Sequence, residues 1–167
     1  MRALRRVALA AVLLALVAVG VFLTASGRQA GPEQPVAFSH KVHAGDNGIP
    51  CLYCHVHARR SAVAGIPSVQ RCVGCHKITA AAKPEVQKLI GYWERKEPIP
   101  WTRVTGMPDF AYFEHWPHLR ADLACQTCHG PVETMERMRE AKALTMDDCV
   151  ACHRKRSVSI DCVVCHR

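Results

Sequence analysis

Five copies of the pattern Cys-x-x-Cys-His run along this chain of 167 residues, and together they use all ten of its cysteines. Two thiols with this spacing can add covalently to the vinyl groups of one haem, and the adjacent histidine can then bind the iron. We number the copies in chain order as motifs 1 to 5. They occupy residues 51–55, 72–76, 125–129, 149–153 and 162–166. The repeated pattern predicts a pentahaem cytochrome c with five molecules of haem c.

Ten cysteines could also form disulfide bonds or zinc sites, but neither fits the spacing. A disulfide framework gives no reason for a histidine after every second cysteine. Zinc ribbons take four ligands from two Cys-x-x-Cys pairs, and five pairs cannot be divided in that way. Redox motifs of the thioredoxin kind occur singly. We therefore predict covalent haem attachment at Cys51, Cys54, Cys72, Cys75, Cys125, Cys128, Cys149, Cys152, Cys162 and Cys165.

The ten histidines match the number of axial ligands that five six-coordinate haems need. The proximal ligands are predicted to be the histidines of the motifs: His55, His76, His129, His153 and His166. Four further histidines lie in a duplicated pattern, Phe-x-His-x-x-His, which precedes motif 1 and again precedes motif 3. We predict them as distal ligands: His40, His43, His115 and His118. Distal ligands commonly come from another segment, so the sequence leaves open which histidine serves which iron.

The fifth distal ligand is open between His57 and Met146. His57 lies two residues after His55 and has no counterpart beside motif 3. Met146 lies shortly before Cys149, and a methionine is more often a core residue than a ligand. The choice has a physical consequence, because a thioether ligand raises the reduction potential of a haem relative to an imidazole.

The repeats also organise the chain. Two modules of two motifs each cover about residues 36–76 and 113–153, and the terminal motif follows at 162–166. Residues 36–167 therefore constitute one pentahaem domain. Residues 27–35 contain two prolines and two glycines and are predicted to be a linker.

Residues 1–26 have the features of a membrane anchor. Arg2, Arg5 and Arg6 precede residues 7–25, which carry no charge. As a helix this run would be about 28 Å long, close to the thickness of a bilayer's hydrocarbon core. The arginines predict a single-pass helix in the cell membrane with the haem domain on the periplasmic, extracytoplasmic face. A cleaved signal peptide is the alternative, but the apolar run is longer than the usual signal core.

So short a chain buries little apolar surface of its own, and the porphyrins must supply most of the core. We expect a mostly irregular fold with short α-helices wrapped around five haems, plus one N-terminal transmembrane helix. Helices are predicted at residues 84–96 and 131–144, with an extended segment at 97–101. The net charge of +8 does not indicate a nucleic acid partner. The propionates of five haems add roughly ten acidic groups that this count omits.

Several segments resemble known multihaem proteins. Residues 38–45 (FSHKVHAG) with 48–51 (GIPC) resemble the class III, cytochrome c7-like domains. Residues 64–67, 98–104, 108–115 and 144–146 resemble, in the same order, the pentahaem cytochrome subunit of bacterial alternative complex III. The menaquinone reductase complex has a similar subunit. These relatives do not generally carry a histidine like His57, which favours Met146.

The resemblance implies an electron-transfer subunit of a quinol-oxidising respiratory complex, with no catalytic residues of its own. Its partners would be polytopic quinol-binding membrane subunits and an iron–sulfur subunit. Electrons would pass to a soluble mono-haem cytochrome c or a terminal oxidase. The alternatives are the cytochrome subunit of a menaquinone reductase complex and a stand-alone quinol dehydrogenase. A nitrite or hydroxylamine enzyme is disfavoured, because the histidines outside the motifs are sufficient to occupy the sixth coordination position of every iron.

Overall fold

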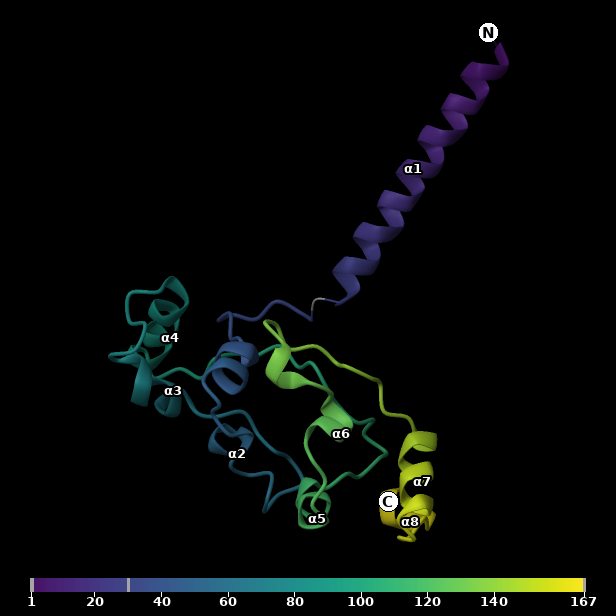
Figure 1. The fold of residues 1–167 in the computed structure, drawn as a ribbon. Coiled ribbons are helices and arrows are strands. Elements are labelled where there is room, and N and C mark those ends of the chain that lie inside the picture. Colours follow the sequence, from purple (N-terminus) through teal and green to yellow (C-terminus); the bar gives the residue numbers. More distant parts are fainter. Residues whose placement is uncertain (1, 30, 167) are drawn as a thin grey trace. The chain divides into compact units, whose positions relative to one another are not determined.

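The structure is a computed structural model that describes residues 2–29 and 31–166 (Figure 1). In the first helix it describes the side chains of residues 5, 6 and 9–21. The chain divides between Gly31 and Pro32 into two units, which we describe separately.

The first unit is a single helix, α1 (Arg2–Gln29), which continues three residues beyond the anchor segment that the sequence predicts. Its described side chains include many exposed large apolar ones: Leu9, Val12, Leu13, Leu14, Leu16, Val17, Val19 and Val21. The sequence predicts that this segment crosses a membrane. In the part of the chain that the structure describes, no helix combines the length and the apolar character that crossing a membrane requires.

The second unit consists of short helices joined by irregular chain, as the sequence predicts (Figure 1). The π-helix η1 and the 3₁₀-helix η2 stand among seven α-helices in its described residues. In chain order the elements are η1 (Lys41–Asp46), α2 (Cys51–Cys54), α3 (Val69–His76), α4 (Pro84–Glu94), α5 (His115–Arg120), α6 (Gln126–His129), η2 (Val132–Thr134), α7 (Met146–Lys155) and α8 (Cys162–Cys165).

The largest apolar cluster lies between α3 and α4. Val36, Val73, Leu89 and Ile99 form its buried centre. The predicted helix at 84–96 is confirmed as α4, which has a proline in its first turn and ends at Glu94. Two residues later Lys96 adopts a left-handed conformation with φ 56°, which the helix cannot continue through. The cluster thus packs α3, and with it motif 2, against α4.

The predicted helix at 131–144 is wrong. Only η2 forms there, and Met135 then takes an extended backbone and is buried. Its carbonyl accepts a hydrogen bond from the Lys41 backbone N–H at 2.9 Å. A Cβ at Gly45 would overlap the Glu133 carbonyl, so η1 can approach this segment only because it carries a glycine there. Tertiary pairing with η1 therefore overrides the local helix propensity.

Candidate haem sites

Each motif lies on a turn of helix. Motif 1 forms α2, motif 2 ends α3, motif 3 forms α6 with the residue before it, motif 4 lies in α7, and motif 5 forms α8. Residues three and four apart occupy the same face of a helix. The two cysteines of a motif and the histidine after them can therefore present their side chains to the same space. All ten cysteines are free thiols rather than disulfides.

Four motif histidines share one hydrogen-bonding arrangement at Nδ1. The ring nitrogen Nδ1 lies 2.6–3.0 Å from a backbone carbonyl oxygen in each. The pairs are His55 with Gly65, His76 with Thr79, His153 with Ser159 and His166 with Phe110. A carbonyl oxygen can only accept, so Nδ1 must donate. The proton is then on Nδ1, which leaves the Nε2 lone pair available for a metal.

Three of the predicted distal histidines follow the same rule. Nδ1 of His43 donates to the Ser39 carbonyl at 2.8 Å, and Nδ1 of His118 donates to the Glu114 carbonyl at 2.7 Å. Nδ1 of His115 donates to the Ala62 carbonyl at 2.6 Å. In the neutral form of these rings the proton is therefore also on Nδ1, and Nε2 is the nitrogen that can bind a metal.

The structure brings distal and proximal rings together in pairs. The ring centres of His43 and His76 are 5.9 Å apart. Those of His115 and His129 are 6.2 Å apart, with the rings 2° from parallel. Those of His118 and His153 are 6.1 Å apart. A first-row metal takes an imidazole nitrogen at about 2 Å, so two rings facing each other across one metal have centres about 6 Å apart.

His40 is the remaining predicted distal histidine, and its ring lies near those of His55 and His43. Burial, together with smaller contributions from those two rings, lowers the pKa of His40 to about 4. Burial also lowers the pKa of His129, with its partner His115 and then His55 contributing. The first histidine of each Phe-x-His-x-x-His pattern thus lies beside the first motif of its module. The second lies beside the second motif.

The duplicated pattern is also duplicated in space. The rings of Phe38 and His40 meet edge to face at 4.9 Å, and those of Phe113 and His115 do the same at 4.9 Å. Phe38 lies 4.3 Å from the ring of His43, and the corresponding distance in the second module is 4.5 Å. The phenylalanine contacts both histidines of its pattern, which holds the two rings in a fixed relation.

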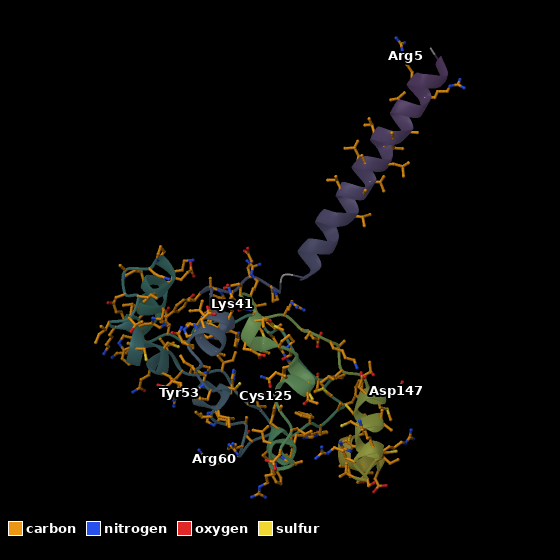
Figure 2. All side chains as sticks on the ribbon, in the orientation of Figure 1. Arg5, Lys41, Tyr53, Arg60, Cys125 and Asp147 are labelled. Carbon is orange, nitrogen blue, oxygen red and sulfur yellow. The ribbon has the colours of Figure 1, made fainter. Side chains whose placement is uncertain are left out.

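The cysteines reveal the order of the motifs in space. Burial raises the pKa of the Cys72 thiol, and Cys54 of motif 1 raises it further. Burial likewise raises the pKa of Cys125, and Cys51 of motif 1 raises it further. Figure 2 labels Cys125 of motif 3 and Tyr53 of motif 1. Motif 1 therefore lies between motif 2 and motif 3.

The same relation extends to the other end of the domain. Burial raises the pKa of the Cys128 thiol, and Cys152 of motif 4 raises it further. Burial raises the pKa of Cys149, with Cys165 of motif 5 as the next contribution. The order in space is thus motif 2, 1, 3, 4, 5, which follows the ribbon from α3 through α2 and α6 to α7 and α8 (Figure 1).

The fifth site differs from the others. Its motif histidine, His166, has the Phe110 ring 6.1 Å away and no histidine ring among the contacts of the described residues. His57 lies elsewhere, against Gly65 in the first module. Met146 is the first residue of α7, whose Cys149 lies near motif 5, and its side chain is 64% exposed. Among the contacts of the described residues, neither His57 nor Met146 touches His166.

The residues present fit haem c. The second unit buries few of its described apolar side chains, and most of those lie around α3 and α4. The motifs instead gather around paired imidazoles whose separation matches two axial ligands of one iron. Every histidine with a hydrogen bond at Nδ1 keeps Nε2 free for that iron. A flat apolar macrocycle between the rings would also supply the core that the chain lacks.

Comparison with known proteins identifies two families along the chain. Residues 23–99 match the class III cytochrome c family, and residues 111–167 match cytochrome c7 and related cytochromes c. The multihaem cytochrome c subunit of menaquinone reductase from Nitratidesulfovibrio vulgaris is 34% identical over 98 residues. That alignment covers 58% of this chain and 46% of the relative, so the chain spans about half the length of the protein it matches.

The two matches cover both modules and the terminal motif, and the relative carries multiple haems. With the five motifs and the paired imidazoles, they identify the chain as a multihaem cytochrome c. It is similar to the class III family over residues 23–99 and to the cytochrome c7 family over residues 111–167.

Proposed function

We propose that this protein relays electrons by outer-sphere transfer through five covalently attached haems and binds no substrate of its own. The observation that carries the proposal is the set of three imidazole pairs with ring centres 5.9–6.2 Å apart. An iron with two such ligands has no open position for a substrate. Haem supplies a one-electron couple between ferric and ferrous iron.

The chain's own residues set the properties of each site. Three irons would be held by the pairs His43 with His76, His115 with His129 and His118 with His153. A fourth would be held by His40 with His55. The backbone carbonyls at Nδ1 fix the orientation of the rings and raise their basicity, which favours the ferric state and a low potential. The order of the motifs makes motif 2 and motif 5 the two ends of the relay.

We propose that His166 and Met146 would hold the fifth iron. Met146 begins α7, and α7 also carries Cys149, which lies beside Cys165 of motif 5. Thr145 caps this helix, with its side chain and that of Asp148 each accepting the other's backbone N–H. The cap fixes the point at which the helix starts, and hence where Met146 stands. His57 lies in the first module, which supports the methionine.

We further propose that the protein is a subunit of a quinone-linked respiratory complex. The relative of known function is a subunit of menaquinone reductase, and this supports a complex of that type better than alternative complex III, which the sequence segments favoured. Its partners would then be polytopic quinone-binding subunits and an iron–sulfur subunit. Alternative complex III, with a mono-haem cytochrome c or a terminal oxidase as acceptor, remains the second candidate.

Attachment to the cell membrane belongs to the same proposal. The described part of α1 exposes large apolar side chains along its whole length, among them Leu9, Leu14 and Val21. A helix that is apolar on every side needs an apolar environment around it. The arginines at its start predict that the haem domain lies on the extracytoplasmic face.

Purification of the protein from its native membrane tests these proposals together. Intact mass should show five covalent haems, and the reduced protein should be low-spin and bind no carbon monoxide. Co-purifying subunits identify the complex. A menaquinone reductase should reduce menaquinone from a low-potential donor, whereas alternative complex III should oxidise menaquinol. Fewer haems would refute the pentahaem relay, and nitrite reduction by the isolated chain would refute a pure electron-transfer role.

A further inference from the structure

A short loop between motif 1 and motif 2 accepts hydrogen bonds from histidines of both modules. The Gly65 carbonyl accepts a hydrogen bond from Nδ1 of His55, the proximal histidine of motif 1, at 2.6 Å. Three residues earlier, the Ala62 carbonyl accepts a hydrogen bond from Nδ1 of His115 at 2.6 Å. His115 belongs to the second module, where it faces His129. Residues 61–66, which we call the bridging loop, therefore contact one ligand of each of two haem sites.

This arrangement differs from those at His43, His76, His118 and His153, whose ring bonds go to carbonyls no more than six residues away along the chain. His115 and Ala62 are separated by 53 positions. The Ala62 carbonyl also accepts the backbone N–H of His115 at 3.2 Å. One carbonyl thus fixes both the main chain and the ring of the same histidine across the boundary between modules.

A hydrogen bond from Nδ1–H to a carbonyl makes an imidazole a stronger donor to its metal and fixes the plane of the ring. Both effects act on the reduction potential of a haem. We propose that the bridging loop is a positioning element that sets the ligand fields of the His55 and His115 haem sites together. Displacement of the loop therefore shifts the reduction potentials of both haem sites in the same direction. The inference rests on haem ligation by these histidines, as proposed above.

The loop is held in shape by two features that can be tested separately. Gly65 has φ +75°, a conformation that other residues adopt only with strain. A Cβ at Gly65 would lie 3.1 Å from Cδ2 of His57, so the His57 ring packs directly against the loop. The His57 carbonyl also accepts the backbone N–H of Ser61, the first loop residue, at 2.8 Å. These contacts give His57 a positioning role, distinct from that of an iron ligand.

Gly65→Ala in the full-length, haem-loaded protein tests the proposal, with Gly48→Ala as the matched control. Gly48 has φ +61° but no atom within 4 Å of a Cβ placed there, so it carries the same kind of backbone strain without a contact to transmit. The readouts are haem content by mass, the low-spin electron paramagnetic resonance spectrum and a redox titration. Substitutions His40→Met and His115→Met, made one at a time, mark which signals belong to the two sites.

Gly65→Ala should retain the wild-type haem content and shift the signals of both marked sites, with both potentials moving upward as the hydrogen bonds weaken. Gly48→Ala should leave the signals and potentials of both sites unchanged. The coupling would be overturned if Gly65→Ala shifted only one site or neither. It would also be overturned if Gly48→Ala produced the same shift as Gly65→Ala. If Gly65→Ala fails to fold, His57→Ala should shift the same two sites and His57→Phe should restore them, because a flat ring again packs on Gly65. No shift in His57→Ala, or no rescue by phenylalanine, would then overturn it.

The two levels of the proposal fail in different ways. A wild-type protein without covalent haem would contradict the proposed function. A wild-type protein with its haems in place, whose two marked signals respond independently to Gly65→Ala, would contradict only the bridging loop.

Discussion

At the scale of single residues, the common feature of the haem sites is the hydrogen bond that most of their imidazoles make through Nδ1. Seven histidines donate Nδ1–H to a backbone carbonyl, so in the neutral ring Nε2 is the nitrogen that can bind a metal. The sequence could supply the number of ligands, because that depends only on residue type and spacing. It could not supply the donors and acceptors, because carbonyls 53 and 56 residues away come close only in the folded chain.

The proposed fifth haem site provides a direct test at this scale. We expect Met146→Ala to open one axial position, giving a high-spin signal and binding of carbon monoxide by the reduced protein. His57→Ala should leave every iron low-spin, because His57 packs on Gly65 rather than facing His166. The same pair of spectra would contradict the assignment if the high-spin signal appeared in His57→Ala and not in Met146→Ala.

Glu85 gives an expected dependence on pH. Its pKa is lowered, first by the Lys88 side chain and then by the Ala37 backbone N–H, which donates to it at 2.7 Å. A carboxylate with a lowered folded pKa stabilises the fold above its ordinary value of 4.5, and this contribution disappears as the pH falls through the lower folded value. The amide resonance of Ala37 in the reduced protein should titrate in that acidic range. Glu85→Gln should abolish the transition, and a transition that survives this substitution would assign it to another group.

At the scale of secondary structure, helices α3 and α4 differ from the rest of the domain because protein side chains pack them. Val73 is 2% exposed and Leu89 is 5% exposed, although Val73 lies inside motif 2. The helical pattern of apolar residues around Leu89 was readable from sequence because the helix packs through one face. The segment at 131–144 was not readable, since its conformation is set by contact with η1 rather than by its own residues.

Leu89→Ala should therefore destabilise the protein by about 2 to 5 kcal/mol, through lost burial and the cavity left behind. The loss should appear in denaturant unfolding of the haem-loaded protein, and hydrogen exchange should locate it in α3 and α4. Leu89→Met, which nearly conserves volume, should cost less than about 1.5 kcal/mol. Equal losses in the two variants would show that packing at this site is not specific.

At the scale of the whole molecule, the haem domain has too little apolar core of its own to fold as an ordinary globule. Its buried apolar residues among those described are Val36, Ala58, Val73, Val86, Leu89, Ile99 and Met135. Burial of this extent cannot offset the conformational entropy of so many irregular residues. The stability of the domain must come largely from contacts with porphyrin.

We expect the chain made without haem attachment to be unfolded apart from α3 and α4. Circular dichroism should show little helix in the second unit, and hydrogen exchange should protect only amides around Val73 and Leu89. The haem-loaded protein serves as the reference. Native-like protection across motifs 3 to 5 in the haem-free chain would mean that the polypeptide alone specifies the fold.

The sequence by itself determined the chemistry: the five attachment motifs, the histidines available as ligands and the duplicated modules, all of which are properties of residue type and spacing. The tertiary structure decided which imidazoles face each other, the spatial order 2, 1, 3, 4, 5, and the loop that joins two sites. Pairing and order depend on contacts between residues far apart in the chain, and local sequence does not encode these. A fold built around cofactors, with few apolar side chains packed against one another, leaves little periodic pattern from which such contacts could be read.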